Sequence, residues 1–152
     1  MGNICRSPAA EGVMCHLLEQ ANLDKQVKVD SAGTIGHHAG NQPDARMQST
    51  SLKRSIRLQH CARQVRAQDL AEFDLILVMD QENLRDVFSL DPSQKFKSKI
   101  KLFCEFCTLH ALREVPDPYY GGNDGFELVL DLLEDGCAEI IKRIQAGTLI
   151  AR

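Results

Sequence analysis

The sequence of 152 residues has no tryptophan, only two tyrosines and little excess of either charge. No stretch approaches the roughly 18 apolar residues of a membrane span, and the start lacks the basic-then-apolar pattern of a secretory signal. The 18 Lys and Arg against 21 Asp and Glu give a net charge of −3, without the basic excess typical of nucleic-acid binding. We therefore expect a cytoplasmic protein with neither nucleic acid nor membrane as partner.

Six cysteines are too few for a disulfide framework over this length, so we expect most to be reduced core residues. Cys104 and Cys107 could form half a zinc site or a redox pair, but no second pair or histidine cluster follows at ligand spacing. The adjacent His37 and His38 could chelate a metal, yet neighbouring side chains in an extended loop point apart. We expect a structural role for the cysteine pair and neither metal nor cofactor.

Apolar residues recur at helical spacing in several segments. Ser7 is the predicted N-cap of the first helix and Pro8 its first residue. Asp44 marks the start of another helix. The predicted helices cover about 8–21, 44–53, 82–88 and 126–144.

Strands are predicted between these helices. Val27 and Val29 indicate a short strand before a glycine-rich loop. The unbroken apolar run 75–79 is typical of a strand covered on both faces, and 100–103 suggests another. The sequence therefore predicts one α/β domain over residues 1–152, with an open, mostly parallel sheet.

The first eight residues form a tight loop that leads into the first predicted helix. Free backbone N–H groups and the positive end of the helix dipole favour an anion there. Arg6 adds a planar fork for two oxygens of a phosphate. On local pattern alone, a capped helix with a solvated arginine is the commoner explanation.

Asp117 lies between two prolines and is followed by Tyr119 and Tyr120. Such an aspartate is more often only a turn residue. A phosphate ester, however, needs charge stabilised on its equatorial oxygens and a proton for its leaving oxygen. Arg6 and Asp117 would supply these two roles.

These segments resemble the low-molecular-weight protein-tyrosine phosphatases. The resemblance implies a four-stranded parallel sheet with helices on both faces, a C-x5-R phosphate loop and a cysteinyl-phosphate intermediate. The chain would act on a phosphotyrosine protein or a small aryl phosphate, as a monomer or weak dimer. The motifs that carry the resemblance are Met-Gly-Asn-Ile-Cys-Arg-Ser-Pro at 1–8, Asp-Ser-Ala-Gly-Thr at 30–34, Ala-Arg-Gln at 62–64, Met-Asp at 79–80, Asn-Leu-Arg-Asp at 83–86 and Asp-Pro-Tyr-Tyr-Gly at 117–121.

The resemblance also implies a role for each matching residue. Arg6 would bind phosphate, Asp117 would be the general acid, and Asp80 would lie near that acid. Ser7 would stabilise the thiolate, and Cys5 could form a protective disulfide with the nucleophile. The implied phosphate loop is Gly2, Asn3, Ile4, Cys5, Arg6 and Ser7; its supports are Asn3, Ser31 and His60; the pocket is lined by His37, His38, Tyr119 and Tyr120.

The family's nucleophile and first strand would precede Met1. We therefore expect that the start was placed at an internal methionine, and that the chain beginning at Met1 folds poorly and is inactive. The helix N-terminus and Arg6 should lower the pKa of Cys5, but its place beside Arg6 points it away from the in-line position. Two alternatives stay open: an arsenate reductase on the same fold, or a non-catalytic relative that binds an oxyanion or a phosphopeptide.

Overall fold

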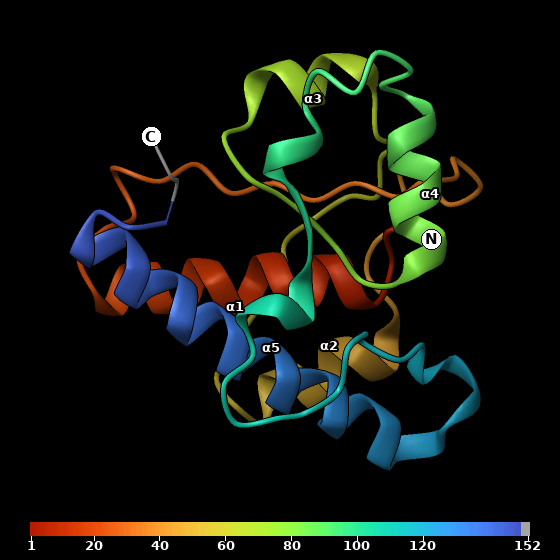
Figure 1. Cartoon of the computed structure of the whole chain (residues 1–152). Coiled ribbons are helices and arrows are strands. Elements are labelled where there is room, and N and C mark those ends of the chain that lie inside the picture. Colours follow the sequence, from red (N-terminus) through yellow and green to blue (C-terminus); the bar gives the residue numbers. More distant parts are fainter. Residues whose placement is uncertain (150–152) are drawn as a thin grey trace.

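The computed structural model describes residues 1–149, and the side chain of Tyr120 lies outside its described part. Figure 1 shows α1 and α5 crossing the middle of the molecule close together, with α3 and α4 above α1 and α2 below it. The elements in chain order are α1 (Arg6–Gln20), α2 (Ala45–Leu52), α3 (Ala67–Glu72), β1 (Ile76–Val78), α4 (Gln81–Ser89), η1 (Lys97–Lys99), β2 (Ile100–Leu102), η2 (Phe103–Phe106), η3 (Pro118–Tyr120) and α5 (Gly122–Ala146).

The predicted helices are present, with changed ends. The expectation that Ser7 caps α1 is wrong, because the helix begins at Arg6 and Cys5 occupies the N-cap without a side-chain bond. Asp44 caps α2 as its predicted start, accepting from the Arg46 and Met47 N–H groups, and Asp80, for which no cap was predicted, caps α4 by accepting from the Asn83 N–H. Short α3 was not predicted, and α5 begins at Gly122, ahead of the apolar stripe that announced it.

The core lies where α5 packs against α1 and the 3₁₀ turn η2. Phe103 of η2 is fully buried and faces Gly136 of α5, where an added Cβ would collide with the Phe103 ring. All six cysteines are free, as expected. Cys104 and Cys137 belong to the core, Cys5 and Cys107 pack against it, and Cys61 is exposed.

The parallel sheet is confirmed but is smaller than the four strands that the resemblance implied. Within residues 1–149, only β1 and β2 form a ladder, with Ile76 opposite Ile100. The strand predicted at Val27 and Val29 is not formed: the segment has no regular secondary structure and no ladder partner. The reason is that this segment and β1 both line a cavity of about 880 Å³, so no neighbour lies beside the segment to complete its hydrogen bonds.

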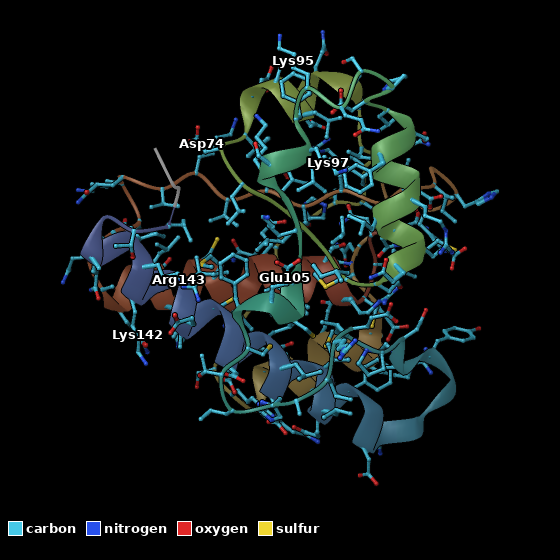
Figure 2. The ribbon with its side chains drawn as sticks, viewed as in Figure 1. Asp74, Lys95, Lys97, Glu105, Lys142 and Arg143 are labelled. Atoms are coloured by element: carbon cyan, nitrogen blue, oxygen red, sulfur yellow. The ribbon has the colours of Figure 1, made fainter. Side chains whose placement is uncertain are left out.

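Most of the charged side chains are exposed or half-buried, and Arg6, Asp91 and Asp135 are buried. Figure 2 shows Lys95 and Lys142 at the periphery, and both are exposed, as is Lys97. No helix in residues 1–149 is long and apolar enough to cross a membrane.

Candidate active site

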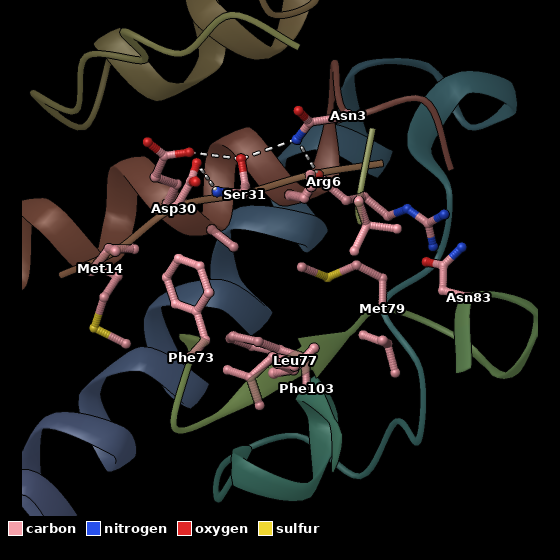
Figure 3. Close-up of a pocket in the computed structure, with 18 of the residues that line it drawn as sticks. Asn3, Arg6, Met14, Asp30, Ser31, Phe73, Leu77, Met79, Asn83 and Phe103 are labelled. Carbon is pink, nitrogen blue, oxygen red and sulfur yellow. Dashed lines mark hydrogen bonds between the residues drawn. The ribbon is translucent and has the colours of Figure 1, made fainter. Parts of the chain in front are cut away.

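Asn3 organises the loop that precedes α1. Its backbone takes the left-handed conformation, with φ at 58°, and the residue is buried. The Asn3 amide Nδ2 donates to Ser7 Oγ at 2.9 Å and to Ser31 Oγ at 3.0 Å, as the dashed lines of Figure 3 show for Ser31. Asn3 Oδ1 accepts from the backbone N–H of Arg63 at 3.0 Å. One side chain therefore joins the loop to α1 and to two distant segments.

Two further side chains close this network. His60 places Nε2 at 2.6 Å from Asn3 Oδ1 and Nδ1 at 3.0 Å from Glu11 Oε2. Ser31 Oγ donates to the same Glu11 oxygen at 2.6 Å. Both ring nitrogens of His60 thus lie within hydrogen-bond distance of a side-chain oxygen, one from the loop and one from α1. Sequence patterns did not single out Glu11, although it lies one turn beyond Ser7 on α1.

Arg6 is buried at the base of the loop, where two contacts fix its guanidinium. Nη1 donates to Asp80 Oδ2 at 2.7 Å and to the backbone oxygen of Val115 at 2.8 Å. Nε and Nη2 have no partner in the described part of the chain and remain as donors for an oxyanion. Burial tends to raise the pKa of Asp80, but the Asn83 N–H and Arg6 outweigh it and hold that pKa below its ordinary value.

Cys5 differs from its sequence-based expectation. Burial, followed by the carboxylates of Asp44 and Asp117, raises the pKa of the Cys5 thiol to about 12, although Arg6 and Arg46 act in the opposite direction. The expected lowering by the helix N-terminus and Arg6 is therefore wrong. Cys5 is predominantly a neutral thiol near pH 7 and a poor nucleophile.

The loop is packed tightly on its far side. An added Cβ on Gly33 would collide with Met1 O and lie 2.9 Å from the backbone nitrogen of Asn3. On another side, the N–H of Asp44 donates to Ile4 O at 2.6 Å. The loop is thus held between the segment after residue 30 and the start of α2.

The segment 115–119, which carries Asp117 and is called the acid loop here, borders the cavity beside β1. Asp117, Tyr119 and His38 line it together with Arg6, whereas exposed His37 does not. Asp117 is exposed, and one of its carboxylate oxygens accepts from the Tyr119 N–H at 3.0 Å. The expected role of Tyr120 depends on a side chain outside the described residues. Arg6 and the Asp117 carboxyl group therefore line the same cavity.

Glu11, Asp30 and His60 bring three possible metal ligands within 4.8 Å of one another. Each is already engaged within the protein: Glu11 and His60 with one another and with the Asn3 network, and Asp30 with Arg63 at 2.9 Å. These contacts account for the cluster as structural support.

Cys107 also has a structural setting. Burial raises the pKa of its thiol to about 12, and its Sγ donates to Leu132 O at 3.5 Å. Both observations fit a core residue better than a reactive one.

The parallel pair, the helix N-terminus and the buried arginine define an α/β protein with a candidate site for an oxyanion. Residues 1–148 match the family model for low molecular weight phosphotyrosine protein phosphatase. The human protein of that name is 40% identical, over 94% of this chain and 90% of its own. A Bacillus subtilis relative, low molecular weight protein-tyrosine-phosphatase YfkJ, is also 40% identical, over 95% of this chain and 92% of its own.

Solved structures agree with this match. A crystal structure of protein tyrosine phosphatase from Entamoeba histolytica is 42% identical and superposes with a TM-score of 0.93. The match covers 98% of this chain and 95% of that one. The chain belongs to the low molecular weight phosphotyrosine protein phosphatases, a family of phosphoric monoester hydrolases.

Proposed function

We propose that this protein removes phosphate from phosphotyrosine in proteins and from small aryl phosphates, in the cytoplasm, and that the chain beginning at Met1 is inactive by itself. The observation that supports this most strongly is the meeting of Arg6, Asp117 and Tyr119 at one cavity. Arg6 and the backbone N–H groups at the start of α1 would hold the phosphate, and Tyr119 would stack on the phenyl ring. The Entamoeba structure, described with Hepes in its active site, offers a parallel, because Hepes carries a phosphate-like sulfonate.

The reaction has two steps. A cysteine thiolate attacks phosphorus, the bond from phosphorus to the phenolic oxygen breaks, and the Asp117 carboxyl group gives that oxygen its proton. A water molecule then attacks the cysteinyl-phosphate, Asp117 takes the proton of that water, and the P–S bond breaks to release phosphate and thiolate. Arg6 stabilises charge on the equatorial oxygens in both steps.

Cys5 is the cysteine of the phosphate loop, and it does not fit the role of the nucleophile. The raised pKa of its thiol leaves little thiolate near pH 7. The family resemblance implies a different cysteine as the nucleophile, and the experiment below tests whether an upstream sequence supplies it.

Two versions of the protein test the function: a short chain that begins at Met1, and a chain extended upstream in its own reading frame. Only the extended chain should hydrolyse 4-nitrophenyl phosphate and phosphotyrosine peptide, and Asp117→Asn should slow it roughly 10²-fold. Turnover by the short chain would make Cys5 or another residue the nucleophile. An upstream frame without strand or cysteine would favour the non-catalytic alternative.

A second substrate class comes from one structural neighbour. A Drosophila arginine phosphatase is 31% identical, with a TM-score of 0.86. Exposed Tyr119 could stack on a guanidinium as well as on a phenyl ring. Parallel assays with phosphoarginine and with arsenate plus a thiol would separate these activities from that on phosphotyrosine, which we expect to be the fastest.

A further inference from the structure

Arg46, in the first turn of α2, lies between the phosphate loop and the acid loop. No sequence motif singled it out. Its guanidinium is paired with Asp44 through two bonds, Nε to Oδ1 at 3.2 Å and Nη2 to Oδ2 at 2.9 Å. Asp44 in turn donates its backbone N–H to Ile4 O and accepts from the Arg46 N–H. These bonds fix the guanidinium relative to the phosphate loop.

The same guanidinium contacts the acid loop. Arg46 Cζ lies 5.2 Å from the centroid of the Tyr119 ring and 5.0 Å from that of Phe126. Phe126 is buried in α5, whereas Tyr119 is 61% exposed. The contact with Arg46 therefore restrains a ring that is mostly in solvent, and it does so from an element that is anchored to the phosphate loop.

The link reaches the proposed acid through Tyr119. The N–H of Tyr119 donates to Asp117 Oδ1, so a displacement of Tyr119 displaces the carboxyl group as well. We infer that Arg46 is a positioning residue, which sets the place of Asp117 relative to the phosphate loop by holding Tyr119. This inference depends on the proposed function, because it assumes that Asp117 protonates the leaving group.

The test compares leaving groups in the active, extended chain. Phenolate needs a proton more than 4-nitrophenolate does, so a misplaced acid slows phenyl phosphate more. Arg46→Met should lower kcat/KM about tenfold for phenyl phosphate and only about two- to threefold for 4-nitrophenyl phosphate. Arg46→Lys should resemble Arg46→Met, because an ammonium lacks the planar fork. Exposed Arg57→Met, a matched control, should change neither value.

Substitution of Arg46 could destabilise α2 and so lower activity for an unrelated reason. Tyr119→Leu breaks the same contact from the other side, and because Tyr119 is mostly exposed, its loss should leave the fold intact. This variant should show the same preference between leaving groups, and the double variant should be no worse than the more severe single variant. Equal losses for both substrates, no loss, or additive losses would each overturn the inference. An inactive parent enzyme would instead reject the proposed function, which separates the two failures.

Discussion

Asn3 Oδ1 and His60 Nε2 lie 2.6 Å apart, although 57 positions separate the two residues in the sequence. The bond ties the left-handed turn at Asn3 to a segment with no regular secondary structure. The conformation of the phosphate loop therefore depends on a contact that local sequence does not supply.

Asn3→Gly tests that dependence, because glycine accepts a positive φ while removing every side-chain bond of Asn3. We expect the free energy of unfolding to fall by about 2–3 kcal/mol, at roughly 1 kcal/mol for each lost hydrogen bond with partial compensation by water. Phosphate affinity, measured by titration calorimetry, should fall in parallel. Asn22→Gly is the matched control, since exposed Asn22 also has a positive φ of 56°. Equal effects of the two substitutions would contradict the prediction.

Arg6→Lys removes the planar fork and keeps the charge. An ammonium cannot bond Asp80, the Val115 carbonyl and two phosphate oxygens together, so we expect kcat/KM of the extended chain to fall roughly 10²-fold or more. Asp80→Asn, which leaves Arg6 in place, should have a smaller effect. A mild effect of Arg6→Lys would argue against its role in binding the oxyanion.

Asp135 predicts an acid-sensitive contribution to stability. Burial opposes ionisation of this carboxyl group, but bonds from His110 and from the Thr108 and Leu109 N–H groups outweigh it and lower its pKa to about 2. A lowered pKa in the folded state stabilises the protein above the unfolded value near 4. That contribution is lost as pH falls from about 4 to about 2.

The measurement is urea unfolding at several pH values for Asp135→Asn and the parent. The variant should be less stable by about 2–4 kcal/mol at pH 7, and the gap should shrink below about pH 4. Exposed Asp24→Asn should behave like the parent throughout. If the difference in unfolding free energy between the variant and the parent did not change with pH, the charge of Asp135 would not be the source of its contribution to stability.

The cavity beside β1 predicts a stability difference between the short and the extended chain. An apolar strand inserted between the segment at Val27–Val29 and β1 would pair both edges and cover half-buried side chains such as Leu77 and Phe73 (Figure 3). We expect the extended chain to be at least about 3 kcal/mol more stable by denaturant unfolding. Equal stabilities would mean that the extension does not occupy the cavity.

The sequence predicted the helices well because their signals are local. Asp44 and Asp80 precede helical segments and cap them. The apolar stripe of the last helix can be recognised from the spacing of its own residues, without knowledge of what it packs against. The strands were harder, since a strand exists only through its neighbour: Val27 and Val29 alternate correctly with polar residues yet have no ladder.

The residues of the candidate site fall into the same two groups: those visible in the local sequence and those that depend on tertiary contacts. Arg6 and Asp117 stand in recognisable motifs, whereas Glu11 and Arg46 act through contacts that only the tertiary structure creates. Glu11 looks like an ordinary polar helix residue until His60 and Ser31 are brought beside it. In the sequence Arg46 resembles a solvated arginine, because its contact with the distant Tyr119 exists only in the folded chain.

Two hydrogen bonds of the Val115 backbone separate a segment of fixed length, which carries Asp117, from a preceding segment whose length is free to change. Its N–H donates to Met79 O at 2.8 Å and its carbonyl accepts from Arg6, so the acid loop has its own anchor two residues before Asp117. Leu109 and Leu112 lie outside this anchor and are exposed. Residues could be inserted or deleted between them over evolutionary time while the proton donor kept its distance from the phosphate-binding arginine.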